Sequence, residues 1–317
     1  NVFNRMLSII PNQAKQEYRF SGKQLSTFSE LSYRFQKEKH LLIAGMNFYS
    51  DNFWEDSLQS PILRNESFKT FGAFANYNLD IGKRIVLEAG FRGDYVTNSR
   101  FFALPRISTL FKWTQKLTTR IGGGFGYRNP TIFNQEAELL GYQNILPIDK
   151  VNVKAEQSYG GNADLGFKTS IGEDFFFNIN QLFFYTYLAN PVVLSDTGSN
   201  SGIYHFVNAD GHTRSVGAET FFKFGFYDFV LFVGYTYTHV TNNFNGTATN
   251  LTLTPRHSVK GDLLYALPGK WRLALDYEYK SGQYLSNGTK TRSFWTFGAL
   301  VEYTWKNYTF FGNVENY

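Results

Sequence analysis

The sequence is dominated by stretches in which apolar and polar residues alternate with a period of two. Residues 271–280, WRLALDYEYK, place Trp, Leu, Leu, Tyr and Tyr at the odd positions, and Arg, Asp, Glu and Lys among the even ones. Side chains of a β-strand alternate between two faces, whereas a helix would scatter both sets around its axis. The same alternation recurs in residues 85–94, 231–238 and 295–305. The pattern therefore predicts an all-β chain whose sheet has one apolar and one polar face.

The predicted strands are long, and the turns between them alternate in length. The strands are expected over residues 24–36, 40–54, 67–79, 84–96, 101–113, 117–128, 156–169, 173–189, 212–226, 229–242, 255–267, 271–283, 292–305 and 308–317. Most exceed the roughly 5 or 6 residues of soluble strands and match the roughly 9 to 11 that cross a bilayer obliquely. Short turns, such as 80–83, alternate with mostly longer loops, such as 129–155 and 190–211. This order is typical of a transmembrane antiparallel up-and-down β-barrel, and a Greek-key sandwich does not require it.

Composition agrees with a barrel in a bacterial outer membrane. Aromatic residues make up 19% of the chain, with 33 Phe and 21 Tyr, which suits the aromatic girdles of such barrels. No run approaches the roughly 18 apolar residues of a transmembrane helix. The net charge of +5 is spread without Lys/Arg blocks, which argues against nucleic acid as a partner. We expect one domain over residues 1–317, without a helical segment.

No residue pattern indicates catalysis, a metal site or a bound cofactor. There are no cysteines, and none of the five histidines has an acidic or imidazole partner at metal-ligand spacing. Asp210 with His212 lacks a distinctive nucleophile, and His257 and Ser258 face opposite ways because they are neighbours on a strand. The glycine-rich segment 122–126 lacks the Lys-Ser/Thr pair of a phosphate loop and permits a bend or a close approach inside the lumen. The sequence therefore predicts no enzyme.

Five short segments carry a resemblance to a known family. They are GGGFGYRNPTIFNQEAE at 122–138, VKAEQS at 153–158, NA at 208–209 with VGAE at 216–219, TPRH at 254–257 and GNVENY at 312–317. In this order they resemble motifs of TonB-dependent outer-membrane transporters, and their details are most similar to members found in Bacteroidetes. Tyr127 stands where the family often has Phe, and Ala155 replaces its Pro.

The resemblance implies a larger protein than this chain. Barrels of this family have 22 strands and an N-terminal plug domain that contacts TonB. The alternation predicts only about 14 or 15 strands of the roughly 22. We therefore expect residues 1–317 to be part of such a barrel, with the plug domain and the last strands outside them.

The resemblance also implies a function, which is the energised uptake of a scarce nutrient. The implied protein partner is TonB, and outer-membrane lipid and lipopolysaccharide would surround the barrel. A ferric siderophore is the first choice of ligand, with cobalamin, haem and other metal chelates behind it. The loop after Pro130 has no His, which argues against haem. Because aromatic and cationic groups suit an anionic chelate, the expected contacts are Arg128, Tyr142, Tyr204 and His205.

Two alternatives from other classes stay open on the sequence. The first is a passive porin with an open lumen, which a plug domain encoded upstream would exclude. The second is a structural or adhesive barrel, which would neither conduct ions nor bind a chelate.

Overall fold

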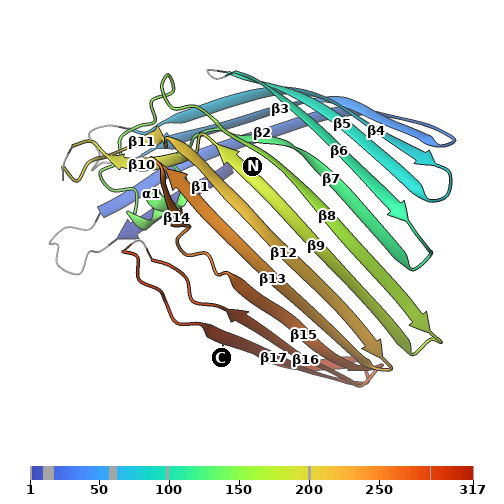
Figure 1. Ribbon diagram of the computed structural model, residues 1–317. Coiled ribbons are helices and arrows are strands. Elements are labelled where there is room, and N and C mark those ends of the chain that lie inside the picture. Colours follow the sequence, from blue (N-terminus) through green and yellow to red (C-terminus); the bar gives the residue numbers. More distant parts are fainter. Residues whose placement is uncertain are drawn as a thin grey trace.

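The computed structural model of the chain is a strongly curved antiparallel sheet with long strands (Figure 1). It describes residues 2–9, 18–56, 63–97, 100–198, 201–285 and 287–316, and the environment of individual side chains from residue 20 onward. None of the helices in these segments combines the length and the apolar character of a membrane-crossing helix.

The order of the strands in the sheet follows their order in the chain. The strands of this path are β1 (Val2–Ile9), β2 (Tyr18–Lys37), β3 (His40–Glu55), β4 (Glu66–Ile81), β5 (Ile85–Val96), β6 (Phe101–Lys112), β7 (Leu117–Arg128), β8 (Glu156–Ile171), β9 (Phe175–Ala189), β12 (Gly211–Phe226), β13 (Phe229–Phe244), β15 (His257–Leu267), β16 (Trp271–Lys280), β17 (Phe294–Trp305) and β18 (Tyr308–Val314). A further strand, β14 (Thr247–Asn250), pairs only with β13. Each neighbouring pair is antiparallel, which confirms the predicted up-and-down order.

The connections confirm the predicted alternation between short and mostly longer segments. All connections at one end of the sheet, called the turn end, are short, and most of those at the other end, called the loop end, are longer (right and left in Figure 1). Two of the long connections carry structure of their own. Between β9 and β12 lies a separate hairpin of β10 (Val192–Asp196) and β11 (Tyr204–Asn208), and between β7 and β8 lies α1 (Gln135–Leu139).

The structure corrects several predictions. The expectation of no helix was wrong, because Asn134 caps α1 by accepting a hydrogen bond from the backbone N–H of Ala137 at 2.8 Å. A helix of five residues is too short to show a 3.6-residue period. The segments 190–211 and 243–254, expected as plain loops, contain strands, and β1 was not foreseen. Strand bounds also shift by a few residues, most at β2, which begins at Tyr18 rather than residue 24.

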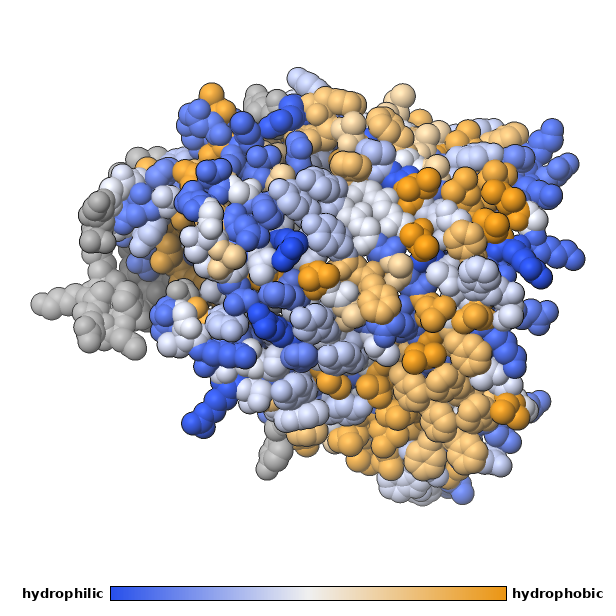
Figure 2. All heavy atoms as spheres, viewed as in Figure 1, coloured by the Kyte–Doolittle hydropathy of each residue, from blue (hydrophilic) through white to orange (hydrophobic). Residues whose placement is uncertain are grey.

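The register joins the apolar faces of neighbouring strands into one surface. On β16 and β17, Leu273 lies opposite Val301 and Leu275 lies opposite Ala299. The apolar positions predicted for the two strands therefore lie side by side on one face. Large apolar side chains of this face are exposed, for example Leu31 at 81% and Met46 at 70%. Figure 2 shows apolar residues gathered over the strands toward the turn end, between more polar regions at the two ends. Such a band fits contact with lipid.

The polar face lines the concave side of the sheet and is called the luminal face. Glu30 on β2 and Arg106 on β6 line one depression of about 380 Å³, although three strands separate them in the sheet. Between them lie Asn76 and Arg92, which are polar like most of this face. The structure therefore has the apolar-outside, polar-inside arrangement of a transmembrane barrel wall.

Candidate functional site

The larger of the two clusters of buried apolar residues in the described segments lies at the loop end, where the long connections fold onto the strand ends. Its buried members, each at most 8% exposed, are Phe20, Phe53, Ile132, Ala137, Ile145, Val153, Val192 and Phe206. We call this group the mouth cluster. It joins the ends of β2 and β3 to the segment 129–155 and to the β10–β11 hairpin, so the segment after β7 reaches strands on the other side of the curved sheet.

Aromatic rings make the contact between the strand ends and segment 129–155. The ring of Phe20 stacks on that of Tyr142 with centroids 4.4 Å apart. Phe53 meets Phe133 edge to face at 4.9 Å. Contacts of these geometries add to the free energy of area burial. The segment is therefore held against β2 and β3 by specific ring packing.

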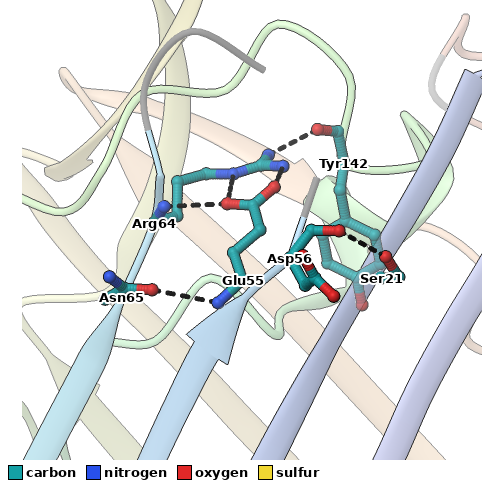
Figure 3. A network of polar contacts seen from close by, with 6 residues as sticks. All are labelled: Ser21, Glu55, Asp56, Arg64, Asn65 and Tyr142. Carbon is teal, nitrogen blue, oxygen red and sulfur yellow. Dashed lines mark hydrogen bonds and ion pairs between the residues drawn. The ribbon is translucent and has the colours of Figure 1, made fainter. Parts of the chain in front are cut away.

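A buried ion pair fixes the same contact (Figure 3). The side chains of Arg64 and Glu55 are 2% and 0% exposed. The Nε of Arg64 donates to Oε2 of Glu55 at 2.9 Å, and its Nη2 donates to Oε1. Its Nη1 donates to the backbone carbonyl oxygen of Tyr142 at 2.5 Å. Because a buried charge is costly unless paired and hydrogen-bonded, this arrangement ties the β3–β4 connection to segment 129–155.

Two further glutamates hold the backbone of segment 129–155. Glu66, at the start of β4, accepts from the N–H of Ile132 at 2.8 Å and from the hydroxyl of Thr131 at 2.7 Å. Glu136 on α1 accepts from the N–H of Leu194 on β10 at 2.6 Å. Although Glu136 is exposed as a residue, its carboxyl is turned toward β10, and this burial raises the pKa of the carboxyl.

Three of the sequence motifs meet beside the mouth cluster. Arg128, from the first motif, pairs through Nε with Oε2 of Glu156 in the second at 2.7 Å. The other oxygen of Glu156 accepts from the N–H of Val192 at 2.8 Å. Asn208, from the third motif, accepts from the N–H of Lys154 at 2.7 Å and donates to its carbonyl oxygen at 2.9 Å. These motif residues therefore join the loop segments to the strand ends.

The structure places two of the four residues predicted to contact a ligand, Tyr142 and Tyr204, against the mouth cluster. His205 follows Tyr204 on β11, so its side chain lies on the opposite face of that strand. The backbone N–H of Tyr204 donates to the carbonyl oxygen of Asn144 at 2.8 Å. Nδ1 of His205 is buried and has no hydrogen-bond partner within the described segments. Arg128 is held apart from them by Glu156, with its side chain 61% exposed. Contact of these four with a ligand stays a prediction.

Sequence reasoning missed Glu55, Arg64 and Glu66. Arg64 and Tyr142 are 78 residues apart in the chain, and no local pattern indicates such a pairing. The one available signal is that Glu55 and Glu66 stand at facing ends of two consecutive predicted strands, where apolar alternation stops. The positions of Glu55 and Glu66 indicate where the strands end, but they do not predict which residue each carboxylate binds.

The glycine-rich run forms part of the luminal wall, not a phosphate loop. Gly122 and Gly124 on β7 lie beside Gly160 on β8 in a depression of about 500 Å³. Arg106 borders it and pairs with Glu88 at 2.6 Å. In the described part of the chain, no group of three or more His, Cys, Asp or Glu residues is placed to hold a metal ion.

Solved outer-membrane receptors share this fold. The siderophore receptor PirA from Acinetobacter baumannii superposes with a TM-score of 0.73 at 16% identity, covering 96% of this chain and 52% of that one. The copper transporter OprC gives 0.76 at 14% identity, with 99% and 55% covered. A mutant of the ferric enterobactin receptor PfeA from Pseudomonas aeruginosa, in complex with enterobactin, gives 0.72 at 15%, with 99% and 53% covered. The chain thus spans about half the length of these structures.

Sequence comparison gives the family. No protein with a curated description matches the chain significantly. Residues 3–317 match the family described as "TonB dependent receptor-like, beta-barrel". This agrees with the predicted outer-membrane location and with the prediction of no enzyme. The similarity to Bacteroidetes members stays a prediction. Because the match covers nearly the whole sequence, this chain belongs to the TonB-dependent receptor β-barrel family.

Proposed function

We propose that the protein takes up a ferric siderophore or a similar metal chelate across the outer membrane in a TonB-dependent manner. The observation that carries the proposal is the mouth cluster. It holds segment 129–155 and the β10–β11 hairpin as a fixed body above a concave, polar wall. A ligand-binding surface built on a rigid support loses less entropy on binding than one built on free loops.

The chemistry around this body suits an anionic chelate. The Arg128 side chain is largely exposed, and His205, Tyr142 and Tyr204 lie on or beside the cluster. Cationic and aromatic groups bind anionic, ring-bearing ligands through charge and ring contacts. The structurally similar proteins include a siderophore receptor, a ferric enterobactin receptor and a copper transporter, which supports a metal-containing cargo. TonB would be the energy-supplying partner, with outer-membrane lipid and lipopolysaccharide around the barrel.

Growth on single nutrient sources tests the proposal. A deletion strain is supplied with one iron chelate, haem, cobalamin or a copper source at a time, and the full-length gene is then restored. We expect restoration to rescue growth on at least one ferric siderophore, and only with TonB present. Rescue on cobalamin, haem or copper alone would overturn the choice of ligand. Rescue without TonB, together with ion conductance in bilayers, would favour the passive porin.

Ligand contact is tested by binding to the full-length protein. Replacing Arg128 with Gln should lower the affinity for the rescuing chelate because one cation is removed. The matched control is Lys270→Gln, which removes a cation from the turn between β15 and β16. Equal affinities of the two variants for the chelate would show that Arg128 does not contact the ligand.

A further inference from the structure

The outer face of the wall carries cations but no carboxylate within the described strands. Because directly paired residues share a face, the register assigns each strand residue either to the outer side, with Leu31 and Met46, or to the luminal side. Every Asp and Glu of the strands β2 to β9 and β12 to β18 falls on the luminal side. The Lys and Arg residues of these strands on the outer side are Lys23, Lys37, Lys69 and Arg214. Charge on the face that meets lipid is therefore of one sign.

Three of these cations lie at a similar height on the wall, and we call them the outer rim. Lys69 and Arg214 each lie 12 residues before the end of their strands (69 to 81 and 214 to 226), and Lys23 lies 14 residues before the end of β2 (23 to 37). With a rise of about 3.4 Å per residue and a strand tilt of about 40°, 12 residues span roughly 30 Å along the membrane normal. The apolar band of such a barrel is about 25 Å tall, and it reaches the strand ends at the turn end, where Phe226 is exposed. The outer rim therefore lies just beyond the band, toward the loop end.

Aromatic rings give the same height for Arg214 independently of this distance. In the register, Tyr159 on β8 lies opposite Tyr187 on β9, which lies opposite Arg214 on β12. The rings of Tyr159 and Tyr187 stack with centroids 4.8 Å apart, and the ring of Tyr187 stacks on that of His212 at 4.6 Å. Rings with an apolar body and a polar edge favour the boundary between lipid and water. Arg214 therefore lies where the headgroups of the outer membrane begin.

The guanidinium of Arg214 is available to a partner outside the chain. Arg214 is exposed, and it forms no ion pair within the part of the chain that the structure describes. The neighbouring His212 is held by Asn243, whose Nδ2 lies 3.2 Å from the Nε2 of the imidazole. A guanidinium presents a planar fork of N–H donors that matches a phosphate group. The site therefore has the charge and the geometry to bind a phosphate at the headgroup level.

We propose that Arg214 binds a phosphate group of lipopolysaccharide in the outer leaflet, and that Lys23 and Lys69 extend this contact around the outer rim. The loop end faces the cell exterior, because barrels of this kind have long extracellular loops and short periplasmic turns. The phosphate-bearing lipid of the exterior leaflet is lipopolysaccharide, whereas glycerophospholipid faces the turn end. Complementary charge without a competing carboxylate on the described outer face favours this occupant. The inference goes beyond chelate uptake and does not rest on it.

Removal of the guanidinium tests the proposal. Fluorescently labelled lipopolysaccharide is titrated against the full-length protein in detergent. We expect Arg214→Gln to weaken binding roughly tenfold through the loss of one charge-assisted contact, and Arg214→Lys to keep part of the affinity. The matched control is Lys270→Gln, which removes a cation from the turn between β15 and β16 at the opposite end of the wall and should leave the affinity unchanged. Equal affinities of Arg214→Gln and Lys270→Gln would overturn the proposal.

Two further lipids identify the group that Arg214 recognises. Lipopolysaccharide freed of its lipid A phosphates should bind the unaltered protein as weakly as the phosphorylated form binds Arg214→Gln, and undiminished binding would contradict recognition of phosphate. Phosphatidylglycerol, a second source of lipid phosphate, should compete weakly. If Arg214→Gln lowered the affinity for phosphatidylglycerol more than that for lipopolysaccharide, the occupant would be a phospholipid and the proposal would fail. Chelate affinity, measured on the same samples, should not differ between Arg214→Gln and the unaltered protein.

Discussion

Charged side chains are partnered differently beside the mouth cluster and in a row of residues on the luminal face, called the charge row. The charge row consists of residues paired in register across β8, β9, β12, β13, β15 and β16, which are Lys168, Asn178, Lys223, Phe232, Asp262 and Asp276. Beside the mouth cluster, Arg64 and Glu55 are almost fully buried and are bound to each other and to the backbone of Tyr142. In the charge row, Lys168 and Asp276 are exposed and have no charged partner among the described residues. A buried charge must be paired by its own chain for the fold to be stable, whereas an exposed one need not be. The first region therefore maintains its own geometry, and the second is free to meet another surface.

The largest expected effect comes from breaking the buried ion pair beside the mouth cluster. Replacing Arg64 with Met leaves the Glu55 carboxylate buried without its cation and removes the hydrogen bond to Tyr142. We expect the free energy of opening segment 129–155 to fall by about 3 to 5 kcal/mol. Hydrogen exchange of that segment, followed by mass spectrometry, measures the change. Unaltered protection would show that ring packing alone holds the segment.

A smaller loss is expected where only neutral hydrogen bonds are removed. The amide of Asn208 binds both backbone groups of Lys154 and the carbonyl oxygen of Asn190. Asn208→Ala should lower the protection of the β10–β11 hairpin by about 1 to 3 kcal/mol. Asn313→Ala is the matched control, because Asn313 lies on the exposed strand β18 and its amide donates, among the described residues, only to Glu315. Equal exchange in the two variants would show that the hairpin does not depend on this bridge.

An exposed ion pair on the luminal wall should contribute less to stability than either of these contacts. Arg272 and Glu302 pair at 3.4 Å with side chains 59% and 24% exposed. Arg272→Met should change the free energy of unfolding by about 0.2 to 1 kcal/mol, because water already solvates both groups. Urea unfolding in detergent, compared with Arg64→Met, gives the contrast. A loss of unfolding free energy as large as that of Arg64→Met would show that buried and exposed ion pairs contribute equally to the stability of this protein.

The two regions also differ in how far the sequence predicts them. Every member of the charge row lies within a predicted strand, and the alternation places Asp276 opposite the apolar face of residues 271–280. The contacts around the mouth cluster could not be predicted from the sequence, because Arg64 and Tyr142 come together only in the curved sheet. The helix α1 and the β10–β11 hairpin were missed for a related reason, since five-residue elements carry too little periodicity. The sequence thus predicts the wall from local pattern and leaves the loop contacts to tertiary structure.

The smallest expected effect is a dependence on pH that has opposite signs at two carboxyls of segment 129–155. Burial against β10 raises the pKa of Glu136, so its stabilising contribution is present below the ordinary carboxyl pKa and is lost as pH rises through the raised value. The hydrogen bond from the Asn152 side chain, followed by those from two backbone N–H groups, lowers the pKa of Asp149, so its contribution is present above the ordinary value and is lost as pH falls through the lowered one.

Two neutral variants separate these contributions. Glu136→Gln keeps an acceptor for the Leu194 N–H but cannot ionise, so it should remove the loss of protection at α1 and β10 on going from about pH 4 to pH 7. Asp149→Asn should instead weaken the turn at residues 149–152 at neutral pH, with less effect in acid. Hydrogen exchange corrected for the intrinsic effect of pH follows both segments. A pH dependence at α1 that persists in Glu136→Gln would assign it to another group, and the mouth cluster would then hold α1 without help from this carboxyl.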